Sequence, residues 1–198
     1  MSNICYISSE AFPLVKTGGL GDVAGSLPTA LKKKWQNIRL LLPAYPEALS
    51  KISKSKVIAE TSYYNQSVTI IEAKLPGTNV TIWLINCPTL FDRPGGPYID
   101  EHGHEWHDNA LRFALFCHAA ADLALNRLQL DWQADIVHCN DWQTGWVPAL
   151  LSLHKVRPAT IFTIHNLAYQ GIFDQQAFYD LHLPESLWHM DGLEFYNQ

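Results

Sequence analysis

The residues best suited to chemistry occur in three short polar segments, and each segment follows an apolar run of strand length. The segments are residues 16–22, 140–143 and 165–166. In open α/β sheets, ligands bind at the carboxyl ends of the strands. We therefore expect the three segments to meet at one edge of a sheet and to form a single site there.

The first segment is a glycine-rich loop with the sequence Lys-Thr-Gly-Gly-Leu-Gly-Asp. Glycines let backbone N–H groups approach a phosphate closely, and the start of a helix adds partial positive charge. Lys16 adds a full positive charge. The loop therefore indicates an anion site, although a plain turn between a strand and a helix is the alternative. No Gly-Lys-Ser/Thr closes the loop, so it is not a Walker A motif.

The second segment places a carboxylate and an indole, those of Asp141 and Trp142, directly after an apolar run. A sugar ring needs that combination, because its hydroxyls need acceptors and its C–H surface packs on an aromatic face. The alternative is that Asp141 only caps the next helix while Trp142 packs in the core. Taken alone, this segment favours the alternative.

The third segment, His165 and Asn166, follows the apolar residues Phe-Thr-Ile. A histidine at the end of a buried strand can hydrogen-bond a ligand or act as an acid or base. A buried structural histidine is the commoner explanation when such a residue is considered alone. Three polar segments at one sheet edge would need three separate structural explanations, so together they favour a functional site.

A histidine-rich stretch at residues 102–108 invites a metal-site interpretation. Its spacing matches neither the His-Glu-x-x-His motif nor the usual zinc patterns of cysteine and histidine. The stretch precedes a helix that we expect after Asp108. We interpret it as a solvated loop and expect no metal.

Strand and helix patterns alternate along the chain. Apolar runs typical of strands lie at residues 4–7, 38–42, 68–73, 80–85, 136–139 and 160–164. Helical periodicity follows Asp22 and Asp108, with Pro28 weakening the first helix, and a third helix is expected at residues 143–153. The alternation predicts one α/β domain with a mostly parallel sheet and right-handed crossovers.

Composition and charge exclude several classes of protein. The 198 residues carry a formal net charge of −5 and no basic stripe, which disfavours nucleic acid as a partner. No uncharged apolar run reaches about 18 residues, so no membrane segment is expected. Glu10 interrupts the apolar N-terminus and no basic residues precede it, unlike a signal peptide. The four cysteines are widely spaced, which fits a reduced, cytoplasmic protein.

Beyond these patterns, the chain resembles the bacterial glycogen and starch synthases. Residues 16–23 after Ser-Glu-Ala-Phe-Pro at residues 9–13 are similar to the signature of that family. Further similar segments follow in the same order at residues 42–46, 91–95, 97–98, 108–109, 112–113, 138–142 and 163–171. The resemblance therefore covers essentially the whole chain.

The resemblance implies a Rossmann-like three-layer α/β domain, the N-terminal, acceptor-side half of a GT-B glycosyltransferase, spanning residues 1–198. A C-terminal nucleotide-binding domain would be absent from this chain, and its polar, aromatic end at Gln198 suggests a sequence cut from something longer. The implied reaction is transfer of glucose from ADP-glucose to the non-reducing end of an α-1,4-glucan or glycogen, with retention and without metal or cofactor. The fragment alone would be inactive.

The resemblance also implies roles for single residues. The implied catalytic residues are His165, Asp141 and Lys16. The implied ligands of the donor and its diphosphate are Lys16, Thr17, Gly18, Gly19, Asp22 and Asn166. The implied acceptor-binding residues are Glu10, Tyr98, Asp141, Trp142, Tyr169 and Gln170. Asn140 stands where some relatives carry histidine, so the resemblance assigns it no role.

Two other functions remain open at the level of sequence. A nicotinamide-dependent oxidoreductase would explain the glycines after the first strand. That interpretation lacks the acidic residue that should end the second strand to hold a ribose, where the chain has Leu-Leu-Pro at residues 41–43. A non-catalytic glucan-binding module is the other alternative, and it would require the natural protein to end near Gln198.

Overall fold

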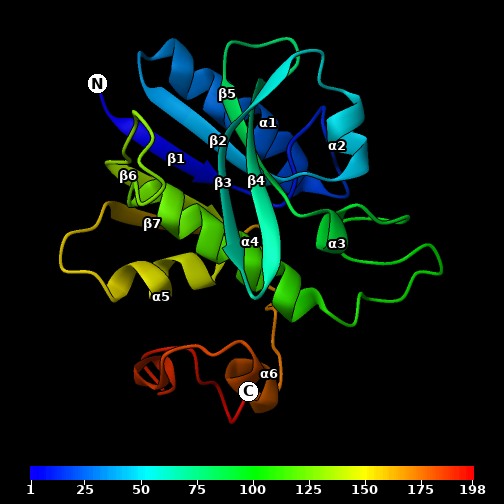
Figure 1. Ribbon diagram of the computed structural model, residues 1–198, viewed down its shortest axis with the longest axis vertical. Coiled ribbons are helices and arrows are strands. Elements are labelled where there is room, and N and C mark those ends of the chain that lie inside the picture. Colours follow the sequence, from blue (N-terminus) through cyan, green and yellow to red (C-terminus); the bar gives the residue numbers. More distant parts are fainter.

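The computed structural model describes all residues 1–198 and contains one seven-stranded sheet (Figure 1). The strand order is β3-β4-β5-β2-β1-β6-β7. The strands are β1 (Asn3–Ile7), β2 (Asn37–Pro43), β3 (Ser55–Tyr63), β4 (Gln66–Lys74), β5 (Thr81–Asn86), β6 (Ile136–Asn140) and β7 (Ala159–Thr163). All pairs from β5 to β7 are parallel, while β4 is antiparallel to both of its neighbours. The predicted mostly parallel α/β sheet is confirmed.

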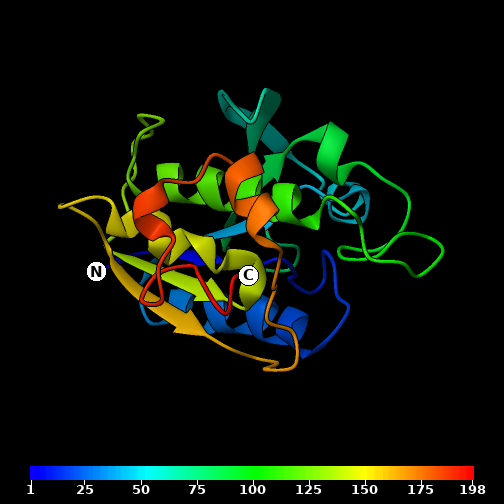
Figure 2. The same cartoon turned by 90° about the horizontal axis from the view of Figure 1, so that it is seen from below.

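Helices cover both faces of the sheet and make three layers. The helices are α1 (Gly19–Lys33), α2 (Pro46–Ser50), α3 (Pro88–Phe91), α4 (Asn109–Ala124), α5 (Trp146–Ser152) and α6 (Gln175–Asp180). Short 3-10 turns lie at η1 (Trp142–Thr144) and η2 (Glu185–Leu187). Figure 2 shows α4 and α5 on one face of the sheet and α1 on the other.

The central strands are apolar along their whole length because they are covered on both faces. In β1 the side chains of Cys5, Tyr6 and Ile7 are fully buried, and β2 and β5 are similar. They belong to one hydrophobic cluster of 48 buried residues that also takes in the inner face of α4. These buried residues form a single core.

Helix α1 begins at Gly19, three residues before the Asp22 start that the sequence suggested, and it continues through Pro28. A proline inside a helix removes one hydrogen bond. Pro28 nevertheless lies on the same buried face as Leu20 and Ala24, so its packing offsets that loss. The predicted third helix is divided at Gly145 into η1 and α5.

Strand β3 was not predicted from the sequence. Most of its side chains are exposed or half-buried, and its polar residues leave no continuous apolar run. It pairs with β4 through a hairpin whose turn residues, Tyr64 and Asn65, both have positive φ, at 52° and 58°. That backbone geometry matches the right-handed twist of two strands, but Tyr-Asn is not the usual sequence signal for it.

The segment after β7 contains α6 and η2, whose ribbons lie below the sheet in Figure 1, and its side chains Phe178, Leu181, Leu183 and Leu187 belong to the same buried cluster. None of the helices combines the length and apolar character that crossing a bilayer requires. All four cysteines are free thiols in the interior.

Candidate active site

The three polar segments lie at the carboxyl ends of adjacent parallel strands. Strand β1 pairs with β6 through Ile7 and Cys139, and β6 pairs with β7 through Cys139 and Phe162. The loops that leave β1, β6 and β7 therefore start side by side. The winding of the chain reverses between β1 and β6, which is where open α/β sheets bind ligands. The expectation of one shared edge is confirmed.

In the loop after β1, the backbone N–H groups of Thr17 and Gly18 already bind an anion from the chain itself. Both donate to Oε2 of Glu10, at 2.5 and 3.1 Å. The other oxygen of Glu10 accepts from the hydroxyl of Tyr98 at 2.7 Å, and that hydroxyl also contacts Ser9 at 2.8 Å. Glu10 is only 3% exposed.

This arrangement changes two expectations from the sequence. The amides of Thr17 and Gly18 are occupied by a carboxylate, so they are not free to hold a phosphate. Glu10 turns inward and orders the glycine loop, with the Tyr98 hydroxyl as its partner, which puts both side chains in a supporting position. The sequence could not show this because it does not give side-chain direction.

The first turn of α1 still offers donors to an outside anion. The N–H groups of Gly19, Leu20 and Gly21 have no acceptor in the chain, and no side chain caps the helix. Lys16 lies beside this turn, and its Nζ pairs with Oδ2 of Asp22 at 2.7 Å. Both charged side chains are about half exposed, so the pair contributes little to stability. Free N–H groups at a helix start together with an accessible lysine can bind an anion.

Asp141 ends β6 in a strained conformation and binds the backbone of the next strand. Its φ of 57° is unusual for a residue other than glycine. Its Oδ1 accepts from the backbone N–H groups of His165 at 2.6 Å and Asn166 at 3.4 Å. Since the side chain makes no cap to η1, the helix-cap alternative is wrong. Oδ2 has no partner in the chain and remains free to accept a hydrogen bond from a ligand.

Asn140 holds the ring of His165 and was not assigned a role from the sequence. Its amide nitrogen donates to the backbone oxygens of Ile7 at 2.9 Å and His138 at 3.3 Å. Because both of these partners are acceptors, the amide nitrogen must face them. The amide oxygen then faces Nε2 of His165 at 3.0 Å and the hydroxyl of Tyr6 at 3.1 Å. Since an amide oxygen can only accept, Nε2 of His165 must carry a hydrogen.

This contact determines which nitrogen of His165 is available to a ligand. With Nε2 donating to Asn140, Nδ1 of the neutral ring keeps its lone pair and has no partner in the chain. His165 therefore presents an acceptor near the free oxygen of Asp141. The sequence did hold a signal for this role, because Asn140 is an amide at the end of an apolar strand. Asn140 is fully buried, and a buried amide needs hydrogen-bond partners.

A second histidine supports this edge from behind. His138 on β6 contacts the hydroxyl of Thr163 through Nε2 at 2.8 Å and packs edge-on against the ring of Tyr6. Burial lowers the pKa of His138, and the nearby His165 lowers it further. His138 therefore stays neutral more readily than a free histidine.

Trp142 is half-buried and contributes to both packing and the site. Its indole packs edge-on against Phe113 and Phe173, with ring centroids 5.0 and 5.7 Å away. Gly171 lies so close that a Cβ there would sit 2.4 Å from the indole. The interpretation of Trp142 as a core residue is therefore correct for most of its surface.

Trp142 also lines a cavity of about 410 Å³ together with Asp141, Tyr169 and Gln170. Tyr169 is 66% exposed, and Gln170 makes only one long hydrogen bond within its own loop. The cavity brings these four residues together, while Glu10 and Tyr98 lie with the glycine loop after β1.

The histidine-rich stretch at residues 102–107 is almost entirely exposed. The backbone N–H groups of His102 and His104 donate to Oδ1 of Asp100, which closes a tight turn. No three side chains of the kinds that ligate metals gather anywhere in the chain.

The sequence of the chain matches that of a known protein family. A family model described as the starch synthase catalytic domain matches residues 3–198. This chain belongs to the starch synthase catalytic domain family. The resemblance stated from the sequence is confirmed, and the dinucleotide-binding alternative has no support.

Several relatives of this starch synthase domain are bacterial. It is 54% identical to a glycogen synthase of Cellvibrio japonicus over 200 residues, covering 100% of this chain and 42% of the relative. It is 50% identical to a glycogen synthase of Thioalkalivibrio sulfidiphilus, covering 98% and 41%. The chain thus spans about two fifths of the length of these relatives.

A solved structure supports the fold of this starch synthase domain. The catalytic domain of starch synthase IV from Arabidopsis thaliana, bound to ADP and acarbose, superimposes with a TM-score of 0.81 at 27% identity. The match covers 96% of this chain and 39% of that one. The Rossmann-like α/β fold predicted from the sequence is confirmed.

Proposed function

We propose that this chain forms the acceptor-side half of a retaining glucosyltransferase. The enzyme would move glucose from ADP-glucose to the non-reducing end of an α-1,4-glucan such as glycogen, in the cytoplasm. The names of the bacterial relatives support the polymer, and the ADP and acarbose bound to the plant domain support the nucleotide and the glucan. A C-terminal domain would be the partner that completes the donor site, and no metal or cofactor is needed.

The observation that carries this proposal is the junction of β6 and β7. There, Oδ1 of Asp141 fixes the backbone of His165, and Asn140 fixes its ring. A free carboxylate oxygen and a free imidazole nitrogen remain at the same strand ends. Two hydrogen-bond acceptors held in fixed positions suit the hydroxyls of a sugar. Because these groups are preorganised, they can also stabilise developing charge without rearranging.

The donor diphosphate belongs at the start of α1 in this proposal. Lys16 would bind it as a point charge and the N–H of Gly19 would add a neutral donor, with Asn166 supplying its amide from the neighbouring loop. The phosphate would draw Lys16 away from Asp22. Asp22 would then act by holding the lysine in place before the donor arrives.

We propose that glucose is transferred on the same face of the ring, with the leaving diphosphate assisting. The bond from the anomeric carbon to the diphosphate oxygen breaks as the acceptor hydroxyl forms a new bond there, and its proton passes to the leaving diphosphate. Asp141 and His165 would stabilise the positive charge that develops on the sugar. Because the diphosphate takes the acceptor's proton itself and, as a weak base, needs no further proton to leave, His165 is not required as a proton shuttle.

The acceptor would occupy the cavity of about 410 Å³ beside Trp142. Tyr169 and Gln170 are the exposed groups that would contact it, and the free oxygen of Asp141 reaches its reacting end. Glu10 and Tyr98 act indirectly, because their hydrogen bonds hold the glycine loop in shape.

The test is a kinetic comparison in the full-length protein that contains this chain. We expect transfer of labelled glucose from ADP-glucose to glycogen, and a large loss of kcat in His165→Ala. Affinity for ADP should change by only a few-fold, because most nucleotide contacts would belong to the other domain. An ADP affinity that falls in parallel with kcat would contradict this division of roles.

A further inference from the structure

A second cavity, of about 200 Å³, lies away from the strand ends of β6 and β7. It is enclosed by the loop after α3, the start of α2 and the inner face of α4. The residues that define it are Val15, Tyr45, Glu47, Arg93, Trp106 and Arg112. Nothing in the proposed glucosyl transfer uses this cavity.

Arg112 places a buried positive charge against the cavity, and no carboxylate hydrogen-bonds to its guanidinium directly, although the charge of Asp108 acts on it. Its side chain is only 1% exposed. Its Nε donates to the backbone oxygen of Leu90, and its Nη1 donates to Pro97 and to the Asn109 side chain, all at 2.8–2.9 Å. These acceptors are neutral, and Arg112 takes part in none of the ion pairs of the chain. The remaining nitrogen, Nη2, donates to no acceptor.

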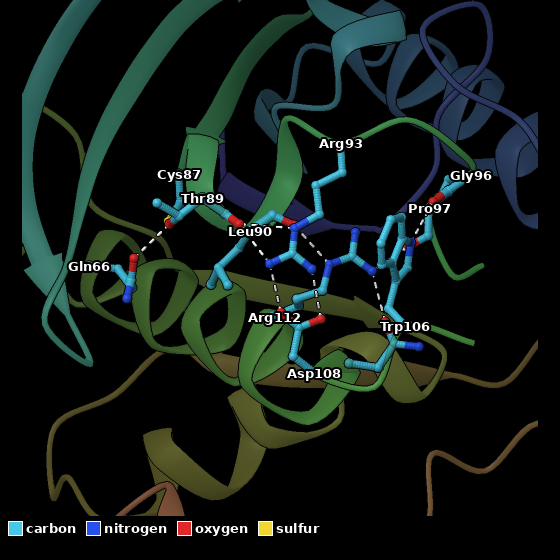
Figure 3. A network of polar contacts seen from close by, with 11 residues as sticks. Gln66, Cys87, Thr89, Leu90, Arg93, Gly96, Pro97, Trp106, Asp108 and Arg112 are labelled. Atoms are coloured by element: carbon cyan, nitrogen blue, oxygen red, sulfur yellow. Dashed lines mark hydrogen bonds and ion pairs between the residues drawn. The ribbon is translucent and has the colours of Figure 1, made fainter. Parts of the chain in front are cut away.

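The nearby carboxylate of Asp108 is bound to a different arginine, Arg93. Arg93 binds Asp108 through two hydrogen bonds of 2.9 and 2.7 Å, so this carboxylate is already paired (Figure 3). Both guanidinium groups lie over the ring of Trp106, at 5.2 and 5.4 Å from its centroid. Two arginines therefore share one aspartate, whose charge also acts on Arg112, while the carboxylate of Glu10 acts on Tyr45 from the loop after β1. A buried charge without a direct partner is costly.

Tyr45 adds an unused donor to the same cavity. Its side chain is 4% exposed, and its hydroxyl is buried without any hydrogen-bond partner. Burial raises the pKa of Tyr45, so the hydroxyl keeps its proton. Glu47 at the rim is paired with Lys51 at 2.6 Å, which leaves its charge compensated.

We propose that this cavity binds a small oxyanion of the phosphate class, with Nη2 of Arg112 and the hydroxyl of Tyr45 as the donors. An oxyanion would accept from the buried Tyr45 hydroxyl and from Nη2 of Arg112, and it would bring a negative charge directly to the guanidinium, whose geometry matches that of phosphate oxygens. The phosphate can be inorganic phosphate or the phosphate group of a hexose ester, since both present the same oxygens to these donors.

The experiment measures binding of inorganic phosphate and of a hexose phosphate by calorimetry, at constant ionic strength, with glucose as the neutral comparison. All proteins carry Lys16→Ala, which weakens anion binding at the start of α1 equally in every variant. Tyr45→Phe removes the proposed donor without leaving a protein group unpaired. Tyr64→Phe is the matched control, because Tyr64 also has a buried hydroxyl without a partner but lies next to His118. Arg112→Lys keeps the charge and removes the guanidinium.

We expect saturable binding of phosphate in the Lys16→Ala background and an unchanged affinity in the Tyr64→Phe control. Affinity should fall roughly tenfold or more in Tyr45→Phe, as for the loss of a hydrogen bond to a charged group. Tighter binding of the hexose phosphate identifies the ester as the ligand, and equal affinities identify free phosphate. The proposal is overturned if phosphate does not bind, or if Tyr45→Phe binds it as well as Tyr64→Phe does.

Discussion

The loop after β1 uses its two carboxylates in opposite ways. Glu10 is buried and binds backbone N–H groups, whereas Asp22 is exposed and holds the ammonium group of Lys16. The first interaction shapes the loop, and the second keeps a mobile charge near the helix start. A ligand phosphate would compete with Asp22 for Lys16 and would leave Glu10 in place.

Replacing Lys16 should therefore weaken catalysis much more than folding. In the full-length enzyme, we expect Lys16→Ala to lower kcat/KM for ADP-glucose by roughly 10- to 100-fold, as for the loss of a charge-assisted contact of about 1.5–3 kcal/mol. The free energy of unfolding should change by about 1 kcal/mol or less, because the Lys16–Asp22 pair is half exposed. Unchanged steady-state kinetics would remove Lys16 from the site.

Asn140 should determine the tautomer of His165. We expect the Nε2–H form of His165 in the neutral ring, because the amide oxygen of Asn140 can only accept. The ¹⁵N chemical shifts of the ring nitrogens measure this directly. Asn140→Ala should produce a mixture of tautomers and lower kcat with little effect on the KM for ADP-glucose. Finding the Nδ1–H form in the unmodified protein would contradict the assignment.

At the scale of elements, the loop after β7 owes its position to close packing over Trp142. Gly171 has a φ of 64°, and an added Cβ would overlap the indole at 2.4 Å. Gly77, in the β4–β5 hairpin, has a similar φ of 73° but open space around its Cβ position. Comparing alanine substitutions at the two glycines therefore separates the cost of a positive φ from the cost of the overlap with the indole.

Gly171→Ala should therefore destabilise the protein more than Gly77→Ala. The positive φ costs about 1–2 kcal/mol in each variant. The overlap with Trp142 adds roughly 1–3 kcal/mol in Gly171→Ala only. Urea unfolding of both variants measures the difference. Equal losses would mean that the loop moves away from the indole without cost.

Two partly buried histidines, His118 on α4 and His138 on β6, make the stability of the fold sensitive to mild acid. Burial lowers the pKa of His118, whose Nε2 has no partner, and burial lowers that of His138 as well. The unfolded chain therefore binds more protons than the folded one once the pH falls below about 6.5. We expect the free energy of unfolding to decrease from about pH 7.5 to 5.5, and His118→Gln to show a smaller decrease. A stability that rises on acidification would have the wrong sign.

For the whole molecule, the sequence predicted the central sheet because its strands are buried on both faces. The apolar runs of β1, β2 and β5 have the length and composition of strands that helices cover on both faces. The exposed strand β3 has no such run and could not be predicted. The position of β3 depends on its pairing with β4, and this pairing is seen only in the folded chain.

The candidate site was predictable in position but not in its internal contacts. Strand ends placed Lys16, Asp141 and His165 at one edge, because parallel strands end together. The inward turn of Glu10 and the clamp by Asn140 depend on side-chain directions that spacing does not determine. Both groups are buried and hydrogen-bonded, so they shape the site from behind the residues that face the ligand.

A transfer assay shows whether the donor site is divided between this chain and a second domain. Incorporation of labelled glucose from ADP-glucose into glycogen is measured for the full-length protein and for residues 1–198 alone, after circular dichroism has shown that the shorter chain is folded. We predict transfer by the full-length protein and none by residues 1–198, because Lys16 and the start of α1 bind only part of the donor. Turnover by residues 1–198, or its absence from the full-length protein, would contradict the account.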